Sequence, residues 1–193
     1  MSYTNPSNII AALFMMLKEH KPSIDQVIMK YEGQKSLTLL EGVRKSVGAS
    51  MFPSFEVEPQ SSKPSWAATR LQRTDFYFYC LLTTCTTNEE LHANYSATLA
   101  TAVIELMSNP SHLQFDIPGE SKVWLNNEVE QSRVMDSFVE NISYKSMKAG
   151  TMRVAEFTWR VTVNEPFTTD FFDKSMPPNE PLEVQAPVIV HPE

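Results

Sequence analysis

The side chains that most often carry out chemistry are scattered along this 193-residue chain. The four histidines are well separated, and neither a His-Glu-x-x-His nor a Cys-x-x-Cys pattern occurs. There is no Gly-x-Ser-x-Gly turn to expose a serine nucleophile, and the five glycines are single and separated, so they form no phosphate-binding loop. The sequence therefore predicts a protein that is not an enzyme and that needs no cofactor or metal.

The residues closest to a catalytic pattern have simpler structural interpretations. Glu89 with Glu90 and Glu128 with Glu130 are typical of a solvated surface, because a general acid/base pair needs two contrasting environments. His92 follows Glu89 and Glu90 on a predicted helix, and we expect a solvated histidine rather than a ligand. Cys80 and Cys85 are predicted to be small hydrophobic residues on one strand, about 16 Å apart and beyond the range of a disulfide.

Charge and hydropathy narrow the class of protein further. The formal charge is −7, and no run of five basic residues provides the footprint that phosphate binding needs. An acidic surface nevertheless suits a conduit through which DNA passes without being held. The apolar stretch 9–17 is too short to span a bilayer of about 30 Å, and the sequence before it lacks a basic signal-peptide region. We expect no membrane contact and synthesis in a cytoplasm.

The first half of the chain has helical spacing followed by strand alternation. Apolar residues at helical spacing predict a helix from 5 to about 17 that stops at Pro22, then a short helix over 24–31 and a third over 37–47. A proline-flanked strand over 52–59, a polar loop over 60–65 and a strong strand over 70–86 follow. Apolar residues alternate on both faces of that last strand, which predicts a central strand covered on both sides.

The second half predicts one long helix and a hairpin. Thr87 and Glu90 form a capping box that opens a helix to about Ser108, whose apolar stripe runs from Leu91 and Tyr95 to Leu106. Short strands are expected over 113–117 and 123–125. A strand carrying Phe138, Ile142 and Tyr144 on one side, a turn over 147–150 and a clean half-buried strand over 154–163 complete a hairpin. Together these elements predict an α/β (α+β) core over 1–165, with a mixed, largely antiparallel sheet flanked by helices.

Two regions have the composition of protein interfaces. Tryptophan and arginine are favoured at interfaces, so Trp66, Arg70 and Arg73 are candidate contact residues. Tyr77 and Tyr79 are candidates because they form the second apolar face of the strand over 70–86, which another subunit could cover. The alternative for the two arginines is a mixed, solvent-exposed strand end.

Residues 166–193 are predicted to form an extended arm rather than a further layer. They hold six of the thirteen prolines, and 165–193 contain six acids and one lysine, which is −5 of the total charge of −7. Spaced apolar residues could anchor such an arm on a neighbouring surface or sheet edge: Phe167, Phe171, Phe172, Val188 and Ile189. The alternative is an acidic terminus without fixed contacts.

The order of these elements resembles the tail-terminator (tail-completion or neck) proteins of long-tailed bacteriophages. The resemblance is carried by the segment Phe52-Pro53-Ser54-Phe55-Glu56-Val57-Glu58-Pro59, by the strand 70–80 leading into the helix 88–107, and by the hairpin 139–161. It covers roughly residues 5–165, and it is one of architecture rather than of a diagnostic motif. The helical segment 22–50 and the proline-rich arm are additions to the family pattern.

The resemblance implies a virion protein of the tail or neck, assembled in the host cytoplasm. It implies a homohexameric ring on the last ring of the tail tube, in contact with the tail-tube protein, the neck or connector protein and, in a contractile particle, the sheath protein. Genomic DNA would only pass through the lumen. The alternatives are another connector or tail ring, such as a head-closure or tube-related subunit, an assembly chaperone, or a cytoplasmic α/β domain that binds a small molecule.

Overall fold

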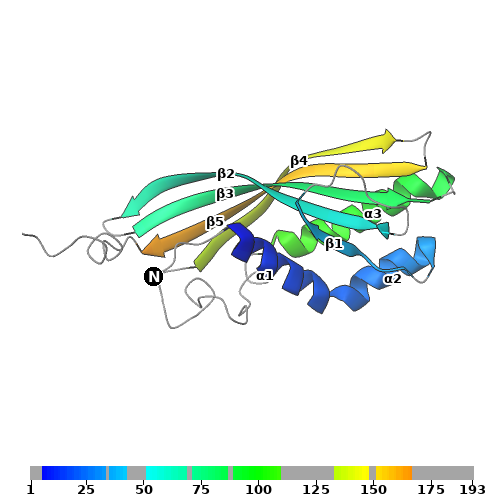
Figure 1. The fold of residues 1–193 in the computed structure, drawn as a ribbon, viewed down its shortest axis with the longest axis horizontal. Helices are drawn as coiled ribbons and strands as arrows, with labels where there is room; N and C mark the ends of the chain where they lie inside the picture. The colour runs from blue at the N-terminus through cyan, green and yellow to red at the C-terminus, as the bar shows by residue number, and fades with distance from the viewer. Residues whose placement is uncertain are drawn as a thin grey trace, which may run out of the picture.

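The computed structural model describes residues 6–33, 35–42, 51–68, 71–86, 89–109, 133–147 and 151–166. Within these ranges the chain forms three helices and five strands (Figure 1). In chain order they are α1 (Pro6–Glu19), α2 (Lys21–Glu32), β1 (Thr38–Glu41), β2 (Ser54–Ala68), β3 (Leu71–Cys85), α3 (Glu89–Met107), β4 (Arg133–Met147) and β5 (Met152–Pro166). The arm 166–193 and the predicted strands over 113–117 and 123–125 lie outside the described residues, except for Pro166, which ends β5.

The five strands form one sheet in the order β1-β2-β3-β5-β4. β1 pairs parallel to β2, and every other neighbouring pair is antiparallel. The sheet is therefore mixed and largely antiparallel, as predicted. β3 is its centre, because β5 pairs with it along its whole length, from Leu71 opposite Pro166 to Cys85 opposite Met152.

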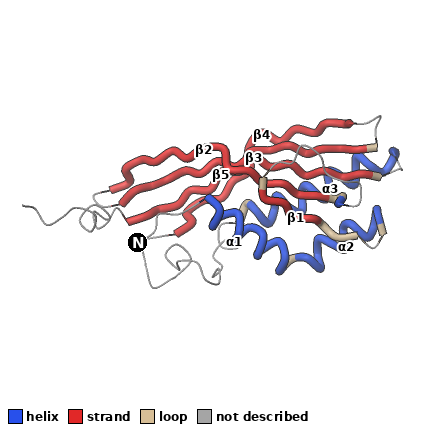
Figure 2. The backbone as a smooth tube through the Cα atoms, viewed as in Figure 1, coloured by secondary structure: helices blue, strands red, loops and turns tan. Residues whose placement is uncertain are grey.

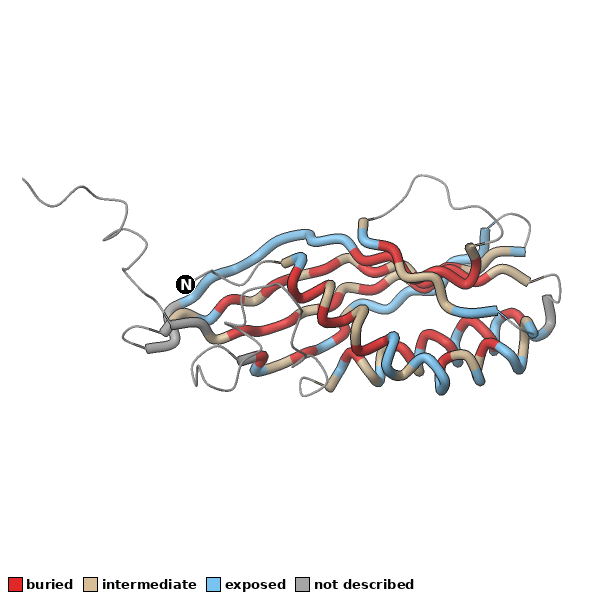
Figure 3. Tube along the Cα trace, turned by 60° about the horizontal axis from the view of Figure 1, so that its bottom comes forward, coloured by how far each residue is buried: buried red, intermediate tan, exposed pale blue. Residues whose placement is uncertain are grey.

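All three helices lie on one face of the sheet, so the molecule has two layers (Figures 1 and 2). α3 contacts β3, β5 and β4, and α2 packs on α3. The core between the layers takes alternate residues of each strand, among them Phe55, Phe78, Cys80 and Trp159, all fully buried. Figure 3 shows buried residues along the helix-facing side and exposed residues along the far edges. The alternation predicted for 154–163 is confirmed, with Phe157, Trp159 and Val161 facing the core.

The two N-terminal helices form where they were predicted. The buried residues of α1 include Ile9, Leu13 and Leu17, which follow the helical spacing of the sequence. α1 ends at Glu19, and Pro22 falls in the first turn of α2, where its missing N–H costs no hydrogen bond.

The segment 37–68 differs from its prediction. The third helix is wrong where it can be checked, because Thr38–Glu41 is the edge strand β1, and 43–50 lies outside the described residues. The polar loop 60–65 is also wrong, since these residues continue β2 and pair with β3 as far as Ala68. Pairing with a neighbouring strand overrides the weak strand propensity of serine and proline there. Both prolines of this stretch, Pro59 and Pro64, lie beyond the part of β2 that β1 covers, and an edge tolerates them.

Three further expectations are corrected by the packing. β3 is covered by helices on one face alone, so Tyr77, Tyr79 and Leu81 are only half-buried. On α3, Leu91 is 46% exposed, and the buried stripe instead begins at His92. Phe138 and Tyr144 do not share a face, because one extra residue in β4 between Glu140 and Ser143 reverses the alternation.

Candidate protein-interaction surfaces

The sheet face opposite the three described helices, which we call the open face, includes the odd-numbered residues of β3. Arg73, Asp75, Tyr77 and Tyr79 alternate with the core residues Thr74, Phe76 and Phe78, so they project to this side. In the register with β5, Tyr77 lies opposite Arg160 and Tyr79 opposite Thr158. The structure thus brings together three of the predicted contact residues: Arg73, Tyr77 and Tyr79.

Arg160 organises the part of the open face nearest β4. Its guanidinium is 3.2 Å from Asp136 and 3.7 Å from Glu140, and it lies 5.8 Å from the centre of the Phe138 ring. The arginine side chain is 28% exposed, so these ion pairs are partly shielded from water. They hold the guanidinium of Arg160 beside the ring of Phe138, which is half exposed.

Two further contacts fix polar groups across the strands. Thr162 donates a hydrogen bond of 2.6 Å to Asp75, which also lies 3.7 Å from Arg73. Lys63 of β2 lies 4.9 Å from the centre of the Tyr77 ring, within range of a cation–π attraction. The open face is therefore a surface of aromatic rings held among paired charges.

At the other end of this face, Lys145 of β4 pairs with Glu156 of β5. Burial raises the pKa of the Tyr79 phenol, and the charge of Glu156 and a hydrogen bond to it raise it further. The hydrogen bond to Glu156 raises the pKa of Lys145. Tyr79 therefore stays a neutral hydroxyl and Lys145 stays charged at physiological pH, which provides binding groups rather than an acid/base pair.

The free edge of β4 is a second surface, and sequence reasoning missed it. Five of the seven large hydrophobic side chains that are exposed among the described residues belong to this strand: Met135, Phe138, Ile142, Tyr144 and Met147. The apolar alternation predicted Phe138, Ile142 and Tyr144 on one side of this strand, but it did not predict that the strand lies at the edge of the sheet. Nothing in the sequence of this strand distinguishes a central position from an edge position.

The remaining predicted contact residues lie at the limit of the described ranges or beyond them. Trp66 lies on β2 opposite Gln72, near the end of the β2–β3 ladder, and its side chain is outside the described set. Arg70 lies outside the described residues, as do Phe167, Phe171, Phe172, Val188 and Ile189. Their role in contacts stays a prediction.

Two buried polar side chains, His92 and Ser137, have structural partners. His92 is fully buried rather than solvated, because the first turns of α3 pack against the end of β3, and its Nε2 lies 3.1 Å from the Thr84 hydroxyl. Ser137 accepts a hydrogen bond of 2.9 Å from the Trp159 indole and donates one to the Met107 carbonyl. Both cysteines are free thiols, as predicted, but only Cys80 is buried, whereas Cys85, which was also expected to be buried, is half-buried. No group of acidic, histidine or cysteine side chains within the described ranges is arranged to hold a metal ion.

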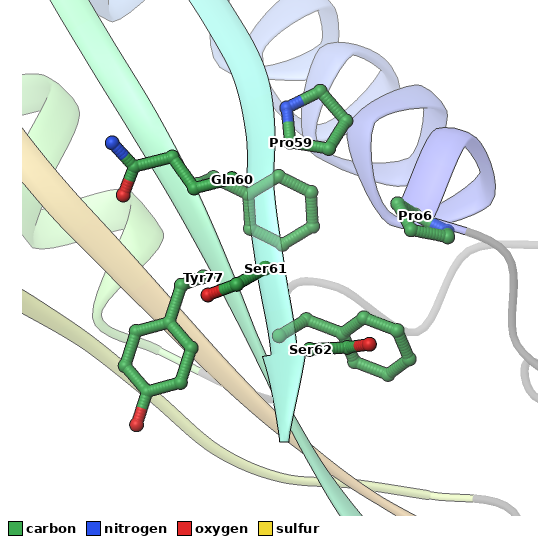
Figure 4. Close-up of a pocket in the computed structure, with 8 residues that line it drawn as sticks. Pro6, Pro59, Gln60, Ser61, Ser62 and Tyr77 are labelled. Carbon is green, nitrogen blue, oxygen red and sulfur yellow. The ribbon is translucent and has the colours of Figure 1, made fainter. Parts of the chain in front are cut away.

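A small hollow lies beside β2, between the start of α1 and the open face (Figure 4). In Figure 4, Pro6 and the ring of Tyr77 lie on opposite sides of β2, and Pro59, Gln60, Ser61 and Ser62 line the strand between them. Its volume of about 170 Å³ is below the 300–1,000 Å³ or so that is usual for small-molecule sites.

No helix among the described segments is long and apolar enough to cross a membrane.

Comparison with known proteins finds a likeness in fold. No protein-family model and no curated protein sequence matches this chain. Among solved structures, a chain of the "virion of native gene transfer agent (GTA) particle" has a TM-score of 0.52, covers 85% of this chain and 100% of its own, and is 12% identical in sequence. Identity this low shows a shared α+β fold and nothing finer.

Proposed function

We propose that this chain is a structural protein of a virion and that it works by assembling with copies of itself and with other virion proteins. The observation that carries the proposal is the fold shared with a virion chain over 85% of this chain. The exposed apolar edge of β4 supports it, because a monomeric protein gains nothing from such an edge and risks unwanted pairing.

Within that class we propose a tail-terminator or neck role, without enzymatic activity. A closed ring on the last ring of a tail tube would cover the growing face and stop further addition of tube subunits, and it would offer a surface to the neck. Its partners would be the tail-tube protein, a neck or connector protein and, in a contractile tail, the sheath protein. The formal charge of −7 suits a lumen through which DNA slides without sticking.

The nearest alternative is another ring of the connector or tail. A tube-related subunit would polymerise by itself, whereas a terminator stops at single rings. A small-molecule-binding domain is the alternative from another class, and it would present a pocket larger than the hollow beside β2, with convergent polar groups.

The experiment combines light scattering at several protein concentrations with negative-stain images of the same sample. A terminator is expected to form closed rings of about six subunits, or to be monomeric alone and form rings on the ends of purified tail tubes. Capping is then measured as an arrest of tube growth when this protein is added to polymerising tube subunits. Long tubes of this chain alone, or tubes whose growth it leaves unchanged, would contradict the terminator role.

A further inference from the structure

The two free edges of the sheet differ in their capacity to accept another strand. Beyond Val57, β2 pairs with no described strand on its outer side, but it carries Pro59 and Pro64, each of which lacks a backbone N–H. Prolines on an edge are among the devices that prevent strand addition, because they leave the outer side without a continuous row of backbone donors. This edge is therefore protected.

The outer edge of β4 has none of these prolines. It runs for 15 residues, and the whole stretch from Asn141 to Met147 is exposed. Asn141, at the extra residue that shifts the register, has a φ of 53°. After this bulge the strand presents Ile142, Tyr144 and Met147 to solvent, at 44%, 50% and 51% exposure. Unpaired backbone groups next to exposed apolar side chains form a site for an added strand.

The sequence of this chain contains a segment of matching chemistry just after β5. Residues 167–176, Phe-Thr-Thr-Asp-Phe-Phe-Asp-Lys-Ser-Met, form a proline-free stretch of ten residues with three phenylalanines. Its two aspartates give it a net negative charge, whereas the only charged residue of 141–147 is Lys145. A strand of seven to ten residues is long enough to cover 141–147, which spans about 24 Å.

The reach of the chain decides between the same molecule and a second copy. Segment 167–176 begins after Pro166, which pairs with Leu71, whereas the exposed part of β4 lies opposite 152–156 of β5. The ten residues of β5 between Glu156 and Pro166 span about 34 Å. Ten further residues reach at most about 36 Å when fully extended. All ten residues would be needed to span the distance back along the sheet to the exposed part of β4. They therefore cannot also pair with the β4 of their own molecule.

We propose that the free edge of β4 over 141–147 binds residues 167–176 of a second copy of this chain as an added strand. The phenylalanines of that segment pack against Ile142 and Tyr144, and its backbone pairs with the outer edge of β4. Because donor and acceptor surfaces differ, the contact is heterologous, and it generates a ring where the rotation between copies closes. The inference rests on the proposed self-assembly and names the surface that carries it.

The test is cysteine cross-linking between two differently tagged copies of the full chain. Both carry Cys85→Ser, because that native thiol is half-buried whereas Cys80 is fully buried. One copy carries Ser143→Cys on β4, and the other carries Thr169→Cys or Ser175→Cys. The control replaces Ser143→Cys by Met29→Cys on α2, a position that is 58% exposed and far from the β4 edge in sequence. The pairs are mixed at the highest soluble concentration and oxidised.

The expected result is a disulfide between the two tagged copies from Ser143→Cys and at least a tenfold lower yield from Met29→Cys. A link within one copy when Ser143→Cys and Thr169→Cys are on the same chain, equal yields from the two positions, or no link would overturn the inference. Capping of tubes without the cross-link would refute the docking site and leave the proposed function standing. A cross-link without rings or capping would support the docking site and refute the proposed tail-terminator function.

Discussion

Replacement of Ser137 by alanine would remove the shared partner of two buried groups. Ser137 is 3% exposed and Trp159 is fully buried, and the indole N–H donates to the serine oxygen over 2.9 Å. The same hydroxyl donates to the carbonyl of Met107 at the end of α3. An unsatisfied buried donor costs about 1–3 kcal/mol, and the lost bond to the carbonyl about 1 kcal/mol more. We therefore expect Ser137→Ala to lower the free energy of unfolding by about 2–4 kcal/mol.

A double-mutant cycle separates the indole hydrogen bond from the rest. In the Trp159→Phe background no indole N–H is left unpaired, so Ser137→Ala should cost only about 1 kcal/mol, giving a coupling energy of about 1–3 kcal/mol. Urea titrations followed by circular dichroism measure each free energy, with an unchanged dependence on urea as the check that the same surface unfolds. Ser61→Ala, on the exposed part of β2, is the matched control and should stay within about 0.5 kcal/mol. Additive effects of the two substitutions would refute the reasoning.

Three further predictions concern single side chains. Burial raises the pKa of the Cys80 thiol well above its usual range, so a thiol reagent at pH 8 should label Cys85 alone in the native protein and both thiols after denaturation; rapid double labelling would contradict the burial. Asn141 has a φ of 53°, so Asn141→Gly should leave stability within about 0.5 kcal/mol, whereas Asn141→Val should lower it by about 1–2 kcal/mol in thermal unfolding; equal stabilities would argue against the bulge. The pKa of Tyr79 is raised above its ordinary 10.0. The neutral phenol therefore contributes to the free energy of unfolding below pH 10, and this contribution is lost as the pH rises through the pKa of Tyr79 in the folded protein. Unfolding measured from pH 8 to 11 should show this loss, and Glu156→Gln should reduce it; an unchanged slope would exclude the glutamate as a cause.

Most of the fold could be predicted from the sequence where periodicity and burial agree. The stripe of α1 and the alternation of Phe157, Trp159 and Val161 each face one core, so their patterns are clean. The polar stretch 60–65 has no such pattern. It lies at an edge of the sheet where the side chains are exposed, so apolar and polar residues do not alternate along it. Residues 60–65 are a strand because they follow β2 along its partner β3, and the local sequence of 60–65 does not indicate this pairing.

The site was predicted in part, and the misses have separate physical causes. Tyr77 and Tyr79 were predicted as contact residues because apolar residues on both faces of a strand indicate that both faces are covered. The described helices cover only one face of β3, and the two tyrosines lie on the other. The β4 edge was missed because nothing in the sequence of this strand marks it as an edge strand. The faces of its side chains were missed because one inserted residue near Asn141 moves Tyr144 to the opposite face from Phe138. His92 was assigned to solvent because its neighbours Glu89 and Glu90 are acidic, whereas the packing of α3 on β3 places it beside Thr84.

The length of the strands has a mechanical consequence. β2, β3, β4 and β5 each have 15 residues, about 50 Å when extended, and the sheet continues past the end of the helical layer (Figure 1). In antiparallel ladders the hydrogen bonds stand perpendicular to the strands. A pull along β3, which is paired on both sides, therefore loads its hydrogen bonds together in shear rather than one after another. The sheet is therefore suited to bear tension between its two ends, because its strands do not separate one hydrogen bond at a time.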